Sequence, residues 1–396
     1  MTTPVPDPLA IGSPSLGSAP GRSRTLVGYD RDADLSRVRR QRRISVLEAL
    51  LGVLATIVLA LAICFVILLV SGQDAVTAYQ WLLAGPYSRP TRFGRVLLET
   101  TTLSIIALSA AIPFRAGLVS LGAEGQLYMG ALAATVVSLF VPLPPGLGIV
   151  VPILAAMTAG ALVALIPGWM KAQLGANELV STLMLNAVLV RLYSFVLTNW
   201  LTPEGATSVA SAYFPDSATI PTLTRIFGVS LDQANLMIVA VPLLAVAVWL
   251  LLKRTPLGYQ IRMSGSNAAF ARYGGIRPKH VTILVFLISG AIAGIAGAHI
   301  VQGVNGRALL TLSAGAAFDG ILVAILARNN PLVIPVAAFF YASLKVGGDV
   351  MEQEMSVGTE IVDVVQALIV LMVTAQLVLT LVRRRREKRL SREMVA

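Results

Sequence analysis

Runs of about 20 apolar residues constrain the fold of this chain more than any other feature. A run of this length spans the bilayer as an α-helix, because backbone groups in lipid must bond within the protein. Hydrophobic residues fill 56% of the 396 positions and charged residues only 13%. The sequence predicts an all-α polytopic membrane protein with about ten transmembrane helices. The predicted spans are 46–71, 96–115, 122–140, 147–170, 178–200, 234–252, 281–300, 318–330, 331–347 and 361–382.

Two of these stretches are interrupted. Residues 117–130 and 315–330 contain several glycines and acidic residues and lead into short apolar pieces, a pattern typical of broken or re-entrant helices. When Gly122–Ala134 is laid over Gly315–Ala327, both opening residues and two alanines match. We therefore predict broken helices at both places, while the few matches give only slight support to an internal repeat.

Small residues also recur along one predicted helix. Ser289-Gly290, Gly294 and Gly297 follow helical spacing within the span 281–300. Helices in lipid associate by close packing, since lipid supplies no hydrophobic drive between them. We expect this face to lie against other helices.

Basic residues gather at three places beside apolar runs. Of 31 Lys and Arg residues, 21 lie in residues 1–43, 253–280 and 383–396. Positive charge marks cytoplasmic segments and attracts anionic lipid heads, so the net charge of +11 requires no nucleic acid. An even number of spans with Arg-rich flanks predicts that both termini are cytoplasmic.

The same predicted membrane topology divides the chain into a membrane domain and two tails. Residues 1–43 are expected to form a disordered basic tail, residues 44–382 the transmembrane domain, and residues 383–396 a second basic tail. The acid-rich segments 201–233 and 348–360 are then outside the cell. Three arginines in the first external loop argue against this topology, because positive charge favours the cytoplasmic side: Arg89, Arg92 and Arg95.

The 253–280 segment predicts a structured cytoplasmic loop, because it holds six basic residues and no acid. Thr255-Pro256 can begin one short helix, and Gly258 and Gly265 punctuate it. Asn267 suits the N-cap of a second helix that closes at Gly274-Gly275. Such an amphipathic pair at the membrane surface is suited to a groove on a soluble partner.

The sequence gives no pattern for catalysis. It lacks a phosphate-binding loop and the H-E-x-x-H motif, and its single cysteine, Cys64, lies in an apolar run. Neither His280 nor His299 has a plausible partner nearby. We predict a protein that is not an enzyme, with no catalytic residues, no metal and no cofactor. If ATP drives transport here, the nucleotide must bind another chain.

Several polar residues lie in or near the hydrocarbon zone, where a mid-helix charge costs about 2.5–3.5 kcal/mol on insertion scales. Glu124 and Gln126 either clamp the broken helix or line a solute path. Asn186 either bonds across helices or contacts solute. Asp319 caps its short helix or, in an ion-coupled transporter, either it or Glu124 is a coupling site. Glu178, following a natural N-cap, suits the positive end of the helix dipole.

Four segments together resemble the permease subunits of bacterial ABC importers, the group of ribose and branched-chain amino-acid permeases, and most closely its nucleoside branch. They are Gly122–Gln126, Asn177-Glu178 with Thr182–Asn186, the loop from Thr255 to Ile276, and Phe318–Ile321 through Asn330-Pro331. The resemblance covers residues 46–382. One departure is Val119-Ser120-Leu121, where members usually show Asn-Ile or Asn-Val before the glycine.

The resemblance implies the fold of a type II ABC importer permease, in a bacterial inner membrane. It also implies a second, often non-identical permease chain, two cytoplasmic ATP-binding subunits and an extracytoplasmic substrate-binding lipoprotein. The solute path for nucleosides would then involve Glu124, Gln126, Thr182 and Asn186. The 253–280 loop would be the coupling helix, with Thr255, Gly258, Arg262, Gly265, Asn267, Arg272, Tyr273 and Gly275 meeting the ATPase. The alternatives are a ribose-like simple-sugar permease and an ion-coupled secondary transporter.

Overall fold

A computed structural model describes residues 74–355 except 229, 230 and 232, together with positions 62, 63, 65, 66, 69, 364 and 367. The described part is helical, with two isolated β-bridges and no strand. The predicted spans 46–71 and 361–382 lie almost entirely outside the described residues, and both predicted tails lie wholly outside them.

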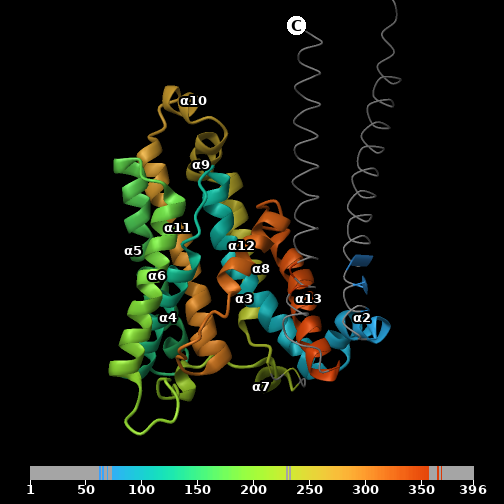
Figure 1. Ribbon diagram of the computed structural model, residues 1–396. Helices are drawn as coiled ribbons and strands as arrows, with labels where there is room; N and C mark the ends of the chain where they lie inside the picture. The colour runs from blue at the N-terminus through green and yellow to red at the C-terminus, as the bar shows by residue number, and fades with distance from the viewer. Residues whose placement is uncertain are drawn as a thin grey trace, which may run out of the picture. The chain divides into compact units, whose positions relative to one another are not determined.

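The longer helices form one packed group (Figure 1). Six of the described helices are long and apolar enough to cross a membrane, so the chain is a polytopic all-α membrane protein. The α-helices are α2 Ala75–Ala84, α3 Pro90–Arg115, α4 Ala123–Phe140, α5 Leu147–Trp169, α6 Glu178–Val196, α7 Leu223–Phe227, α8 Met237–Arg254, α9 Pro256–Ser266, α10 Ala268–Tyr273, α11 Pro278–Ala298, α12 Ala316–Leu326 and α13 Ile334–Met355. The π-helices are η2 Met170–Leu174, η3 Leu197–Leu201 and η5 His299–Asn305, and the 3-10 helices are η1 Gly85–Tyr87 and η4 Asp216–Ala218.

Glycines bring α4, α5 and α11 into backbone contact. A Cβ atom added at Gly294 would stand 2.1 Å from the carbonyl oxygen of Ala156, and one at Gly290 would stand 2.4 Å from that of Gly160. One at Gly297 would approach an α4 carbonyl just as closely. The predicted small-residue face of α11 is therefore confirmed. It lets three helices meet without intervening side chains.

Both predicted interruptions are present. After α3 ends at Arg115, Gly117 takes a φ of +74° and the chain runs without regular structure to the start of α4. The short helix α12 follows Gly315, with φ of +84°, and precedes Arg328 and Asn329, both with φ of +53°. The predicted span 318–330 is therefore an 11-residue helix. The matching Gly-Ala pairs occupy the same helix positions, N-cap and first residue, but Gly122 has a φ of −78° and Gly315 a φ of +84°, so their backbone conformations differ.

Two predicted loops are wrong in their extent. Residues 92 and 95 lie in the first turns of α3, and residues 349–355 form the last turns of α13. There Arg92 pairs with Glu354, and Arg95 Nη2 lies 2.8 Å from Asp349 Oδ2. Hydropathy began α3 too late and ended α13 too early, because it assigns the charged residues of these end turns to loops. In the structure these charges pair with one another. Two of the three arginines that argued against the predicted topology are thus partners of acids from the segment 348–360.

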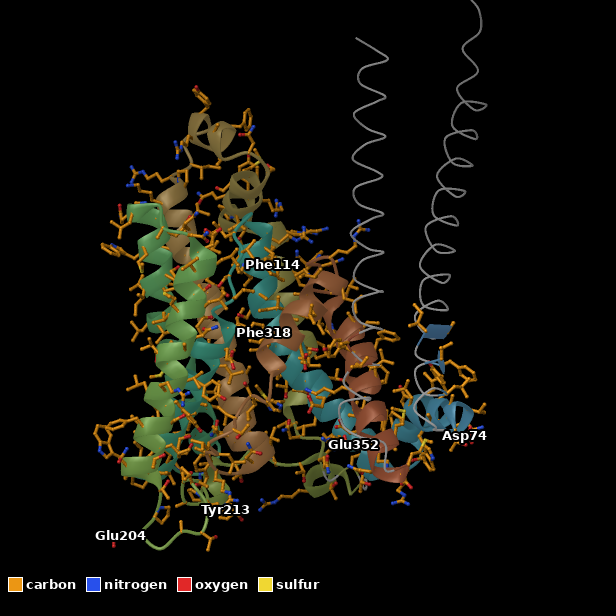
Figure 2. All side chains as sticks on the ribbon, viewed as in Figure 1. Asp74, Phe114, Glu204, Tyr213, Phe318 and Glu352 are labelled. Carbon is orange, nitrogen blue, oxygen red and sulfur yellow. The ribbon has the colours of Figure 1, made fainter. Side chains whose placement is uncertain are left out.

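The two ends of the helices differ in what they carry. Helices α9 and α10 lie at one end, and α7 lies at the other (Figure 1). Glu204, Tyr213 and Glu352 all lie at the α7 end (Figure 2). The basic loop and the acid-rich segments that the sequence assigned to opposite sides are therefore at opposite ends of the structure.

Candidate functional site: a cavity within the helices and a loop at one end

A cavity of about 490 Å³ between α4, α6 and α12 opens widely to the surface of the chain, because Leu183, Arg191 and Phe318 in its lining are exposed. This volume is in the range of sites that bind small molecules. Phe318, at the start of α12, lies roughly midway between the two ends of the helices (Figure 2). The lining residues are Glu124, Leu183, Asn186, Ala187, Val190, Arg191 and Phe318.

Asn186 connects α6 to the start of α4. Its Nδ2 donates to the carbonyl oxygen of Leu121 at 2.7 Å, and its Oδ1 accepts from the N–H of Gly125 at 3.0 Å. The first N–H groups of a helix have no partner within the helix, so this amide satisfies one of them. Of the two roles that the sequence left open, Asn186 takes the bond across helices, while its side chain also borders the cavity.

Gln126 and Thr182 lie behind the cavity wall and are not among its lining residues. Thr182 is fully buried; its hydroxyl donates to the carbonyl oxygen of Glu178 at 2.7 Å and accepts from the N–H of Leu121 at 3.3 Å. The Gln126 side chain is 2% exposed, and its Oε1 has no hydrogen-bond partner among the described residues. Both side chains pack against Gly122. They shape the contact between α4 and α6.

Glu124 and Arg191 give the cavity two polar groups of opposite charge. Glu124 accepts one long hydrogen bond, 3.4 Å from Ser313 Oγ, which joins the starts of the two broken helices. Within the described residues, neither Glu124 nor Arg191 forms an ion pair. Among largely apolar neighbours, such groups are available to hydrogen-bond a solute that carries donors and acceptors.

Asp319 does not cap α12, contrary to one of the two roles expected for it. Helix α12 begins after Gly315, and Asp319 lies too far along its first turn to serve as the N-cap. Its carboxylate instead accepts from the Tyr341 hydroxyl at 2.6 Å and from Lys345 Nζ at 3.0 Å, both on α13. The sequence analysis missed Lys345, because it read that residue as part of an apolar span and its partners lie on other helices.

The start of α6 carries another ion pair. Asn177 is the N-cap, as predicted, and accepts from the N–H of Leu179 at 3.0 Å. Glu178 occupies the first turn and lies 2.7 Å from Lys171 Nζ. Because Lys171 belongs to η2, this pair ties the end of the α5 segment to the start of α6.

The loop at the α9 end has the predicted local structure. Thr255 caps α9, since its hydroxyl accepts from the N–H of Gly258 at 3.0 Å. Asn267 caps α10 by accepting from the N–H groups of Ala269 and Phe270. Gly275, with φ of +77°, allows the turn that follows α10. Both helix starts were therefore readable from capping residues.

Besides the two caps and the turn glycine, the other five predicted loop residues form an inner set of three (Gly258, Arg262 and Gly265) and an outer set of two (Arg272 and Tyr273). A Cβ at Gly258 would stand 2.1 Å from the Leu251 carbonyl oxygen, and one at Gly265 would stand 2.3 Å from that of Arg115, so both glycines hold α9 against the membrane helices. Arg262 has a buried Nη1 without a partner among the described residues.

Outside that inner set, Arg272 is exposed and Tyr273 is 92% exposed. The sequence analysis missed Phe270, which is 59% exposed beside them and can join them in meeting a partner. An aromatic in the pattern A-A-F-A-R-Y, on a six-residue helix with one buried position, was the signal available for it.

Spanning helices, a cavity between them and the exposed α9–α10 loop at one end are the features of a membrane transport subunit. No group of three His, Cys, Asp or Glu side chains in the described part could hold a metal ion. Residues 92–374 match the family described as branched-chain amino acid transport system / permease component, and the chain belongs to this permease family.

Three relatives illustrate what the chain is similar to. The glucose ABC transporter permease protein TsgB13 of Haloferax volcanii is 34% identical, over 80% of this chain and 84% of that protein. The guanosine ABC transporter permease protein NupP of Bacillus subtilis is 32% identical, over 83% and 94%. The nucleoside ABC transporter permease protein NupB of Lactococcus lactis is 27% identical, over 82% and 91%. No solved structure matches the chain.

These matches confirm the predicted class. The chain is an ABC transporter permease, a membrane transport component and not an enzyme. A second permease from each of two organisms also matches: the guanosine permease NupQ of Bacillus subtilis at 25% identity and the nucleoside permease NupC of Lactococcus lactis at 26%. In each of these two organisms, two relatives of this chain are therefore named as permeases for the same solute.

Proposed function

We propose that this chain forms the membrane path for nucleosides in an ABC importer, through the cavity between α4, α6 and α12. The observation that carries the proposal is the lining of this cavity. It combines an aromatic face at Phe318 with a carboxylate at Glu124 and a guanidinium at Arg191. Asn186 borders the path and fixes α4 beside it, while Gln126 and Thr182 shape the wall from behind.

The chemistry of this lining suits a nucleoside. A planar base can stack on the Phe318 ring, and its N–H and carbonyl groups can bond to Glu124 and Arg191. The simple-sugar alternative keeps support from the glucose permease at 34% identity. The ion-coupled alternative has no support from the family match. Asp319, one of its candidate coupling residues, is bonded to Tyr341 and Lys345.

The α9–α10 loop is proposed to couple the path to ATP hydrolysis on another chain. Phe270, Arg272 and Tyr273 face outward and would occupy a groove on the ATPase. Thr255 and Gly258 hold α9 close to the end of α8. Closure of the ATPase pair would then move α8 and α11, which flank the loop, and alternate access to the cavity.

The remaining partners and the orientation complete the proposal. The chain pairs with a second, non-identical permease, as the paired relatives suggest, and works with two cytoplasmic ATP-binding subunits and a substrate-binding lipoprotein. It lies in the bacterial inner membrane with the α9–α10 end and both termini in the cytoplasm. Residues 44–382 are the permease domain, and residues 1–43 and 383–396 are basic tails.

Phe318→Ala tests the cavity, with Phe340→Ala as the matched control. The two rings are equally exposed, at 44% and 45%, but Phe340 is on α13 and does not line the cavity. Uptake of labelled adenosine is measured with unlabelled uridine or ribose as competitor. We expect Phe318→Ala to weaken nucleoside uptake and competition, and Phe340→Ala to leave both unchanged. Competition by ribose alone, or equal effects of the two variants, would contradict the proposal.

A further inference from the structure

We infer that Tyr341 and Lys345 of α13 are positioning residues for the solute path: they hold α12 through Asp319, and thereby set where Phe318 stands in the cavity. This inference rests on the proposed function of the cavity. It concerns three residues that touch no solute themselves and lie outside the cavity lining.

Helix α12 needs side-chain contacts to fix its orientation, because it is short and interrupted on both sides. It has 11 residues, and the chain takes left-handed φ values at Ala314 and Gly315 before it and at Arg328 and Asn329 after it. Helix α12 therefore does not continue a neighbouring helix that would fix its direction. Its placement follows from what it packs against, mainly α3 and α13.

The strongest polar contacts of α12 start at Asp319. One carboxylate oxygen accepts from the Tyr341 hydroxyl at 2.6 Å, and the other lies 3.0 Å from Lys345 Nζ. Hydrogen bonds to a charged group are shorter and stronger than those between neutral groups, and the Asp319 and Lys345 side chains are mostly buried, at 22% and 23% exposed. Lys345 Nζ also lies 3.8 Å from Glu99 Oε2, so the cluster joins α3, α12 and α13.

Phe318 precedes Asp319, and successive helical side chains are about 100° apart around the axis. One residue can thus line the cavity while the next bonds to α13. A small rotation of α12 that lengthened the Asp319 bonds would also swing the Phe318 ring. The position of the aromatic face is therefore coupled to two bonds on a neighbouring face of the helix.

Tyr341→Phe tests this coupling, because it removes one hydroxyl and keeps the ring. Tyr87→Phe is the matched control: the Tyr87 hydroxyl also bonds to α13, at 2.8 Å from Ser343 Oγ, but within the described residues it forms no hydrogen bond with α12. In the assembled importer, we expect Tyr341→Phe to raise the KM of nucleoside uptake roughly two- to tenfold, the equivalent of one hydrogen bond, with Vmax per inserted protein unchanged. Tyr87→Phe should leave the KM unchanged.

An unchanged KM for Tyr341→Phe, or an equal rise for both variants, would overturn the inference. Lys345→Arg supplies a second test that does not depend on Tyr341, because it keeps the charge and alters the reach; it should also raise the KM. Phe318→Ala in the same assay separates the two levels of the account. If Phe318→Ala leaves the KM unchanged, the cavity proposal fails; if it raises the KM and neither α13 variant does, only the positioning inference fails.

Discussion

Gly294 lies where α11 crosses α4 and α5, and replacing it with alanine should force these helices apart. A Cβ there would stand 2.1 Å from the carbonyl oxygen of Ala156, and this backbone atom has no rotamer through which to move away. Ordinary contact begins at 3.4 Å, so the helices would have to separate by about 1.3 Å. Overpacking of this kind typically costs about 1–3 kcal/mol.

The assay for Gly294→Ala is thermal unfolding of the purified permease in detergent, with Gly274→Ala as the control. At Gly274 an added Cβ would meet its nearest atom at 3.5 Å, which is ordinary contact, so no neighbour has to move. We expect a clear fall in melting temperature for Gly294→Ala and little change for Gly274→Ala. Equal melting temperatures for Gly294→Ala and the wild type would refute the reasoning that these helices meet backbone to backbone.

Three further predictions follow from local contacts. Asn186→Ala leaves the Leu121 carbonyl and the Gly125 N–H without this partner and should cost about 1–3 kcal/mol of stability, whereas Asn199→Ala, on an exposed side chain, should cost little in the same melting assay. Arg272→Glu should abolish substrate-stimulated ATP hydrolysis with membrane insertion intact; unchanged stimulation would remove its coupling role. The Thr77 hydroxyl lowers the pKa of Asp74 below its usual 3.8, so the α2 cap stabilises the fold above that pH and is lost as pH falls through the lowered value. Hydrogen exchange of the first-turn amides of α2 should accelerate beyond its intrinsic pH dependence there, and should not in Asp74→Ala.

Much of the fold could be predicted because it depends on local rules. Capping residues at Asn177, Thr255 and Asn267 gave three helix starts, and glycine spacing gave the packing face of α11. The ends of α3 and α13 were missed, because their end turns carry charges that hydropathy assigns to loops. Those charges are neutralised by partners about 260 residues away in sequence, as Arg92 and Glu354 are.

The candidate site was only half predictable, for the same reason. Glu124 and Asn186 stood out as polar residues in apolar surroundings, and both border the cavity. Phe318 was noted only as part of a segment that resembles the permease group and not as a path residue, since an aromatic residue in an apolar stretch gives no sign of lining a cavity until α12 is placed beside α6. Lys345 was likewise invisible without its partner Asp319. Pairings between distant helices decide the site, and a single sequence does not contain them.

The central claim is that this chain carries nucleosides in an importer driven by a separate ATPase. The most direct test is uptake of radiolabelled adenosine, uridine and ribose in cells expressing this chain with its neighbouring permease, ATPase and binding protein, with and without an ATPase-dead variant. The account predicts uptake of both nucleosides that is lost in the dead variant. Uptake of ribose alone would contradict the substrate, and nucleoside uptake indifferent to the dead variant would contradict the driving force.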